Sequence, residues 1–173
     1  MNRRNLLLGT AALAGVAGYA VTRGAPALAK VPDLVPDPSI GTVTKTEEEW
    51  RAILSPAEFE VLREEGTERP FTSPLNDITE PGTFACAGCD LPLYRTEWKF
   101  KSGTGWPSFW QGIEGHLGTK EDRGFFMVRT EVHCGRCEGH LGHIFEDGPK
   151  PTGLRHCING VAMRFTPEGD AKS

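Results

Sequence analysis

The chain has 173 residues, of which 19 are Lys or Arg and 23 are Asp or Glu, so its formal net charge at pH 7 is −4. This length predicts one domain with a hydrophobic core of its own. The acidic balance argues against a nucleic-acid partner, which would need clustered basic side chains, and against binding to an anionic membrane surface.

Residues 1–29 have the features of an export signal. Arg3 and Arg4 precede an apolar run, and the Ala-Leu-Ala sequence at 27–29 ends the leader as a small-residue cleavage site. The paired arginines are similar to those of bacterial twin-arginine signals, so we expect export to the periplasm, with only transient contact with the membrane. A membrane anchor made by an uncleaved leader is the alternative, because the apolar run is near the lower length limit for spanning a bilayer.

Residues 30–44 are rich in proline and follow no helical or strand period, which predicts a linker. The sequence Thr-Glu-Glu-Glu at 46–49 is a capping box and predicts a helix through Leu54. A second helix start lies at Ser55, because a proline follows it at the first helical position, and Gly66 supplies the stop. We expect these helices to pack on the domain rather than to carry chemistry.

The domain is placed at residues 45–168, and most of it consists of short apolar runs separated by Gly, Pro and Asn, a pattern typical of antiparallel strands. The dipeptide Asn159-Gly160 predicts a two-residue hairpin between the last two strands. We therefore expect a mainly β fold with small N-terminal helices. The predicted strands are Thr83–Ala85, Leu93–Arg95, Phe125–Thr130, His140–Phe145, Leu154–Ile158 and Val161–Phe165.

Four of the five cysteines form two C-x-x-C pairs, Cys86 with Cys89 and Cys134 with Cys137. Each short spacing lets a turn present two thiolates to one ion, and two such pairs can complete a tetrahedral site. Four thiolates favour zinc, with iron as a substitute in the same geometry, and a site without an open position is structural. Two disulfides or a dithiol redox motif are the alternative interpretations.

The fifth cysteine, Cys157, is left over and is the candidate for a reactive thiol. Its neighbours include Arg155 and His156, a cation and an imidazole that can favour the thiolate. Arg155 and Asn159 lie two residues on either side of it, hence on the same face of a strand. There Arg155 can lower the thiol pKa and Asn159 can orient a partner. Each also has a purely structural interpretation, as a solvated strand residue and as the hairpin turn.

Two further segments carry aromatic and imidazole side chains. Residues 103–110 frame aromatic rings with two glycines and a proline, which predicts an irregular loop that either walls a small pocket or packs in the core. His140 and His143 can share a site only if the intervening Gly142 bends the strand. Because the four paired cysteines already satisfy an ion, acid–base chemistry suits these histidines better than metal binding.

Taken together, the two C-x-x-C pairs, the 102–109 loop, the 139–145 segment and the 155–159 segment resemble the B-type peptide-methionine sulfoxide reductases. The resemblance runs from about Thr46 to Pro167. It implies two antiparallel sheets with small N-terminal helices and one structural zinc per chain, remote from the active site, with no organic cofactor. It also implies reduction of the R epimer of methionine sulfoxide, free or in proteins, and hence repair of oxidised proteins.

The same resemblance implies a role for each candidate residue. Cys157 would attack the sulfoxide sulfur, leaving methionine and a Cys157 sulfenic acid. The histidines would serve as the acid and as a positioning group, and other residues would support the nucleophile or bind the substrate, with one indole receiving the methyl group. The resemblance assigns the acid and positioning roles to His143 and His140, and support of the nucleophile to Arg155 and Asn159. It assigns substrate binding to Trp106, whose indole receives the methyl group, and to Phe109.

Thr104 departs from the family pattern, because many relatives have a second, resolving cysteine there. The sulfenic acid therefore lacks an internal partner, and we expect an external, thioredoxin-like thiol to reduce Cys157. A thiol peroxidase or general disulfide reductase, and a non-enzymatic zinc module that binds a protein, are the other classes considered. Neither explains why the aromatic loop, the histidine pair and Cys157 occur together.

Overall fold

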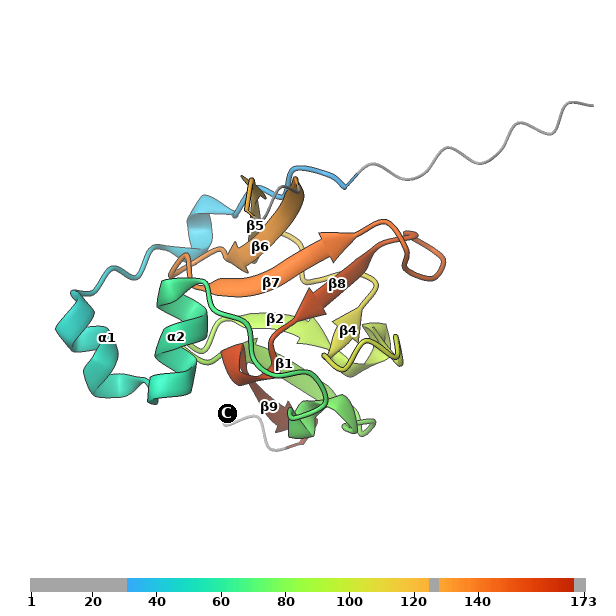
Figure 1. Ribbon diagram of the computed structural model, residues 1–173, viewed down its shortest axis with the longest axis horizontal. Coiled ribbons are helices and arrows are strands. Elements are labelled where there is room, and N and C mark those ends of the chain that lie inside the picture. The colour runs from blue at the N-terminus through green and yellow to red at the C-terminus, as the bar shows by residue number, and fades with distance from the viewer. Residues whose placement is uncertain (1–30, 125–127, 170–173) are drawn as a thin grey trace, which may run out of the picture.

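The computed structural model describes residues 31–124 and 128–169 and contains two antiparallel sheets with two helices at one end (Figure 1). The predicted export signal and its cleavage site lie outside the described residues. Within the ranges described, no helix is long and apolar enough to cross a membrane.

The two sheets confirm the mainly β fold with two antiparallel layers. In the smaller sheet, β1 lies in the middle and pairs with a strand on each side. The order of its strands is β2 (Pro92–Arg95), β1 (Gly82–Cys86) and β9 (Met163–Pro167). In the larger sheet the order is β3 (Lys99–Phe100), β4 (Ser108–Phe109), β8 (Arg155–Ile158), β7 (His140–Phe145), β6 (Arg129–Cys134) and β5 (Leu117–Asp122).

The two helices begin where the sequence predicts. In α1 (Glu47–Ile53) and α2 (Pro56–Glu64), the N-cap residues Thr46 and Ser55 each form a complete capping box. The C-terminus of α2 differs slightly, because Glu65 rather than Gly66 adopts the left-handed conformation that ends the helix, with φ of 57°. Helix α2 packs against β7 and buries Phe59, Val61 and Leu62, so the helices cover one end of the larger sheet.

Aromatic rings fill the core between the sheets. The Tyr94 ring of β2 stacks on Phe109 of β4, with ring centroids 4.4 Å apart, and Phe84 of β1 meets Phe109 edge-on at 5.1 Å. All three side chains have 0 % exposure. Since a buried aromatic ring that bridges two layers contributes about 2–3 kcal/mol by burial alone, this trio holds the sheets face to face.

Residues 31–44, predicted to be a linker, contain no strand or α-helix but are hydrogen-bonded to the domain. The backbone N–H of Leu34 donates to Thr119 Oγ1 at 2.8 Å, and the Thr119 N–H donates back to the Leu34 carbonyl at 3.1 Å. Further along, Asp37 N–H donates to the Gly115 carbonyl at 2.8 Å. The segment therefore covers part of β5, the outermost strand of the larger sheet.

The predicted hairpin at Asn159-Gly160 is wrong. Strands β8 and β9 belong to different sheets, and a short 3-10 helix, η4 (Gly160–Ala162), joins them. Asn159 has φ of −63°, whereas the hairpin turn expected of an Asn-Gly pair needs positive φ at both positions. The backbone N–H groups of Gly160 and Val161 instead donate to the Glu68 carboxylate, a contact across more than 90 residues.

Strand boundaries differ elsewhere as well. The strand predicted from Phe125 is found as β6, which begins at Arg129, while residues 125–127 lie outside the described part of the chain. The strand predicted from Val161 begins at Met163. Strands β3, β4 and β5 were not predicted, and β4 lies inside the segment expected to be an irregular loop.

Candidate functional site

Strand register places Cys157 in the middle of a row of three polar side chains. In the β7–β8 pairing, His143 lies directly opposite Cys157, and in the β4–β8 pairing, Ser108 lies opposite Cys157 on its other side. Residues directly opposite each other in antiparallel strands project from the same face. The fold therefore aligns an imidazole, a thiol and a hydroxyl on one face of the larger sheet.

A pocket of about 130 Å³ opens over this row and is called the Cys157 pocket below. It brings together four residues predicted from the sequence: Cys157, His143, Asn159 and Trp106. The indole and a phenyl ring supply apolar surface, and the imidazole, the amide and a guanidinium supply polar groups. The complete lining is Thr67, Trp106, Arg129, Gly142, His143, Phe145, Cys157 and Asn159.

Gly142 allows β7 and β8 to approach closely at this point. A Cβ atom there would lie 2.1 Å from the Cys157 carbonyl oxygen, and the residue has φ of +157°. The β6–β7 register also shifts beside it, since Val132 faces Gly142 but His133 faces His140. This irregularity is the predicted bend, and it brings the His140 and His143 rings to a centroid distance of 5.4 Å.

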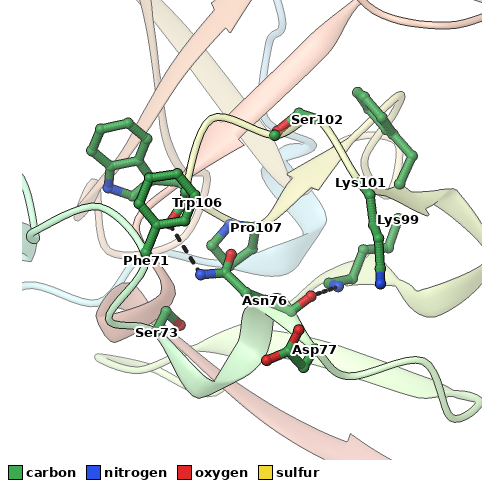
Figure 2. Close-up of a pocket in the computed structure, with 12 residues that line it drawn as sticks. Phe71, Ser73, Asn76, Asp77, Lys99, Lys101, Ser102, Trp106 and Pro107 are labelled. Atoms are coloured by element: carbon green, nitrogen blue, oxygen red, sulfur yellow. Dashed lines mark hydrogen bonds between the residues drawn. The ribbon is translucent and has the colours of Figure 1, made fainter.

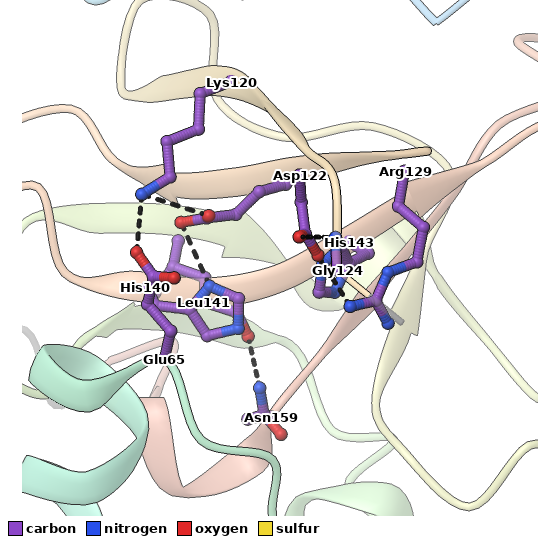
Figure 3. A network of polar contacts seen from close by, with 10 residues as sticks. Glu65, Lys120, Asp122, Gly124, Arg129, His140, Leu141, His143 and Asn159 are labelled. Atoms are coloured by element: carbon purple, nitrogen blue, oxygen red, sulfur yellow. Dashed lines mark hydrogen bonds and ion pairs between the residues drawn. The ribbon is translucent and has the colours of Figure 1, made fainter. Parts of the chain in front are cut away.

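His143 is held by a carboxylate that sequence reasoning missed. Its Nε2 lies 2.8 Å from Asp122 Oδ2, and the same oxygen accepts a hydrogen bond from Arg129 at 2.6 Å (Figure 3). The hydrogen bond from His143, together with Arg129, lowers the pKa of Asp122 to about 2. Burial, together with the nearby charge of Arg129, lowers the pKa of His143 overall, although Asp122 raises it. The ring is therefore neutral at pH 7, with Nε2–H donated to Asp122, and Nδ1 is the atom through which it can exchange a proton.

His140 occupies a different environment and does not line the Cys157 pocket. It is only 3 % exposed, and its Nδ1 lies 3.0 Å from Oε1 of the buried Glu131 (Figure 3). Burial raises the pKa of Glu131, but His140 and Lys120, whose Nζ is 3.2 Å away, outweigh burial and lower it overall. Of the two predicted histidines, the structure thus brings His143 to the pocket and leaves His140 behind it.

The electrostatic surroundings of Cys157 differ from the expectation. Burial raises the pKa of the Cys157 thiol, and the lowering effects of the Arg155 charge and the Thr104 hydroxyl do not fully offset it. Two of the three guanidinium nitrogens of Arg155, Nε and Nη2, donate to Asp147 at 2.8 and 2.9 Å, and the guanidinium lies over the Phe145 ring. Part of the cationic charge expected to favour the thiolate is therefore shared with a carboxylate.

Asn159 and Trp106 hold one wall of the pocket through Glu68, a second residue missed from the sequence. The Trp106 indole N–H donates to the Glu68 carbonyl at 3.1 Å, and Asn159 Oδ1 accepts from the Glu68 N–H at 3.0 Å. The other end of the Asn159 amide donates to the Leu141 carbonyl of β7 at 3.0 Å. Asn159 is thus a bridge between strand β7 and the wall, not a hairpin turn.

Phe109, predicted to bind the substrate, lies elsewhere. Its side chain is fully buried against Tyr94 and Phe84 in the core and is not part of the pocket lining. The reason is strand alternation, since the neighbouring Ser108 lies opposite Cys157 on one face of the sheet and Phe109 must point to the other face.

The four paired cysteines gather at one point, called the cysteine cluster below. Their sulfur atoms all lie within 4.8 Å of one another, with Cys86 Sγ 3.6 Å from Cys137 Sγ and Cys89 Sγ 3.5 Å from Cys134 Sγ. A tetrahedral zinc with bonds of about 2.3 Å places sulfurs about 3.8 Å apart, and a disulfide needs about 2.0 Å. The donor set fits a metal ion. The cluster also joins the two sheets, because Cys86 ends β1 and Cys134 ends β6.

Comparison with known proteins identifies relatives of the whole domain. The SelR domain model matches residues 54–167. The chain is 50% identical over 131 residues to the peptide methionine sulfoxide reductase MsrB of Methanosarcina barkeri, which covers 75% of this chain and 92% of that protein. The MsrB of Pseudomonas putida is 51% identical over 130 residues, covering 75% and 98%. The MsrB of Agrobacterium fabrum is 50% identical over 126 residues, covering 72% and 93%.

Proposed function

Because the chain belongs to the SelR-domain family of B-type peptide methionine sulfoxide reductases and reduces the R form of methionine sulfoxide, we propose that Cys157 is its catalytic nucleophile. One observation carries this proposal. Cys157 and His143 face each other across β7 and β8, and both line a pocket that Trp106 closes with an apolar ring.

In the proposed reaction the Cys157 thiolate attacks the sulfoxide, and the sulfur–oxygen bond of the substrate breaks. A bond forms between the oxygen and the Cys157 sulfur, and the oxygen takes a proton, which leaves a Cys157 sulfenic acid and releases methionine. The cysteine sulfur is oxidised by two electrons and the substrate sulfur is reduced by two. His143 Nδ1 is placed to accept the proton of the Cys157 thiol and then to deliver it to the departing oxygen, since Asp122 engages the other ring nitrogen. Trp106 and Phe145 provide the apolar surface for the methyl group.

The sulfenic acid is then reduced by an external thiol in a one-cysteine cycle. A first thiol displaces water and forms a mixed disulfide with Cys157, and a second thiol of the donor releases the free enzyme. Two observations support this cycle. The side chain that lies beside Cys157 Sγ, at 3.9 Å, is the hydroxyl of Thr104 and not a thiol. All other cysteines of the chain belong to the cysteine cluster.

The cysteine cluster is proposed to hold one structural zinc ion. Four thiolates leave no open coordination position, so the ion would contribute to folding and not to the reaction.

The paired arginines of the leader support export to a periplasm, where the enzyme would repair oxidised methionines of other exported proteins. Retention by an uncleaved leader is the alternative.

Turnover of separated R and S methionine sulfoxide with dithiothreitol tests the nucleophile. The parent is expected to reduce the R form, and Cys157→Ser is expected to lose this activity completely, because a serine hydroxyl is not an equivalent two-electron reductant. The S form and hydrogen peroxide serve as controls for general thiol chemistry. Retained R-form turnover in Cys157→Ser would overturn the assignment, and preferential turnover of peroxide by the parent would point to a thiol peroxidase.

A single-turnover experiment tests the recycling step. Without reductant, the parent is expected to form one methionine per chain and to keep a sulfenic acid that a nucleophilic trap labels at Cys157. Thr104→Cys is the matched variant, because it places a thiol next to Cys157 and should give an intramolecular disulfide in place of the trapped product. A stoichiometric intramolecular disulfide in the parent would refute the one-cysteine cycle.

A further inference from the structure

We propose that the hydroxyl groups of Ser108, Ser102 and Thr104 form a directed chain of hydrogen bonds that ends on the Cys157 sulfur and stabilises its thiolate. The chain would make Thr104 a positioning and activating residue for the nucleophile. The inference rests on the proposed function only in taking Cys157 as the reactive thiol.

The direction of the chain follows from counting protons. Ser108 Oγ donates to Ser102 Oγ at 2.8 Å, and its other acceptor, the Trp106 carbonyl, is more distant at 3.2 Å. Ser102 Oγ also accepts from the Thr104 N–H at 3.3 Å, so both of its lone pairs are engaged. The proton of Ser102 therefore points to Thr104 Oγ1 at 2.8 Å, and the proton of Thr104 points to Cys157 Sγ at 3.9 Å.

Both ends of the chain are held in place. Ser108 is only 1 % exposed and belongs to β4. The loop that carries Ser102 and Thr104 is fixed through the Gly105 carbonyl, which accepts hydrogen bonds from the Phe71 N–H at 2.8 Å and from the Asn76 amide at 3.0 Å. Figure 2 draws the second of these bonds as a dashed line from the Asn76 amide. Because its position is fixed from both sides, the Thr104 hydroxyl is preorganised to act as a donor.

The thiolate needs such a donor because its other surroundings do not suffice. Burial raises the pKa of Cys157, and the Thr104 hydroxyl is one of the groups that lower it. Each hydroxyl in a directed chain polarises the next, which strengthens the terminal hydrogen bond. The charged and titratable groups that face the sulfur or its pocket are Arg155 with its partner Asp147, His143 with its partner Asp122, and Arg129.

The pH dependence of Cys157 alkylation tests this chain of hydrogen bonds without any turnover of substrate. The metal-loaded full chain is treated with iodoacetamide over a range of pH, and modification of the Cys157 peptide is measured by mass spectrometry. Thr104→Val, which keeps the shape but loses the hydroxyl, is expected to raise the midpoint by about one pH unit and to slow alkylation about tenfold below it. Ser102→Ala is expected to raise the midpoint by a smaller amount, and Thr104→Ser to restore the parent midpoint.

Thr72→Val is the matched control, because it removes the hydroxyl of an exposed threonine that donates to the Arg69 carbonyl and lies outside the hydroxyl chain. An unchanged midpoint in Thr104→Val would overturn the proposal, and Thr104→Ala provides the same test if the valine variant does not fold. If the alkylation midpoint shifts in Thr104→Val but not in Ser102→Ala, the proposal that the hydroxyl groups act as a chain of hydrogen bonds would be overturned. Absence of sulfoxide turnover in a parent with normal alkylation would count against the proposed function alone.

Discussion

At the scale of single residues, the contrast between the two histidines is the most informative feature. Both come from strand β7. His143 lines the Cys157 pocket and its Nε2 contacts the Asp122 carboxylate, while His140 is buried beside Glu131. A carboxylate behind an imidazole fixes its tautomer and increases its basicity. Only His143 combines such a carboxylate with access to the substrate.

Removing the carboxylate that supports His143 should impair turnover most at higher pH. Asp122 raises the pKa of His143 against the effect of burial, so Asp122→Asn is expected to lower that pKa further and leave fewer protonated rings at any pH. We expect kcat for the R sulfoxide at pH 7 to fall about tenfold and the descending limb of the pH profile to move to lower pH. An unaltered profile would show that His143 does not supply the proton. Asp77→Asn, at an exposed carboxylate outside this pocket, is the control.

The sequence was sufficient to predict the groups to which we assign the chemistry, but not the residues that hold those groups in place. Cys157, His143 and Trp106 stand in recognisable motifs. Asp122 and Glu68 do not, because each acts through a contact with a residue far away in the chain. The apparent pattern also failed for Phe109, whose facing is decided by the pairing of the two-residue strand β4.

At the scale of elements, a local sequence signal was reliable only where no distant residue competes with it. The capping boxes of α1 and α2 are complete within four residues of sequence, and both helices start as predicted. The Asn159-Gly160 pair is a local hairpin signal, but the N–H groups of Gly160 and Val161 donate to the Glu68 carboxylate, and the backbone there forms η4. A tertiary contact thus overrides the local preference.

The loss of the Glu68 carboxylate should therefore weaken both η4 and the pocket wall. Glu68→Ala leaves two N–H groups of η4 without acceptors, and we expect a decrease of about 2 kcal/mol in the free energy of unfolding, measured by urea denaturation. Because Trp106 and Asn159 bind the backbone of this residue, KM for the sulfoxide should rise more than kcat falls. Glu80→Ala, at an exposed carboxylate, is the comparison. Equal stability of the two variants would contradict this account of η4.

At the scale of the whole molecule, the cysteine cluster connects parts of the fold that share no strand pairing. It joins the end of β1 in the smaller sheet to the end of β6 in the larger one. The aromatic trio holds the same two layers elsewhere, through Phe84, Tyr94 and Phe109. The spacing of the cysteines predicted that four of them gather at one point, as they do, but the position of the cluster between the two sheets required the topology.

Removal of the metal should therefore destabilise the entire domain. We expect a strong chelator to lower the unfolding midpoint by well over 10 °C, because the binding energy of a structural ion contributes several kcal/mol to folding. Calorimetry should be paired with metal analysis of the same sample, and restored stability after zinc addition provides the control. If the melting curve is unchanged in fully metal-free protein, the cluster is not a structural metal site.

The hydrogen bonds between residues 31–44 and the rest of the domain bear on the proposed membrane anchor. The backbone is held at Leu34, which in sequence lies only five residues after the predicted cleavage site at Ala29. A retained leader would therefore keep the domain against the bilayer and restrict it to targets near the membrane surface. Cleavage of the leader would release the domain to diffuse. If the proposed export signal operates, its processing would decide which oxidised proteins the pocket can meet, with no change to the residues of the pocket.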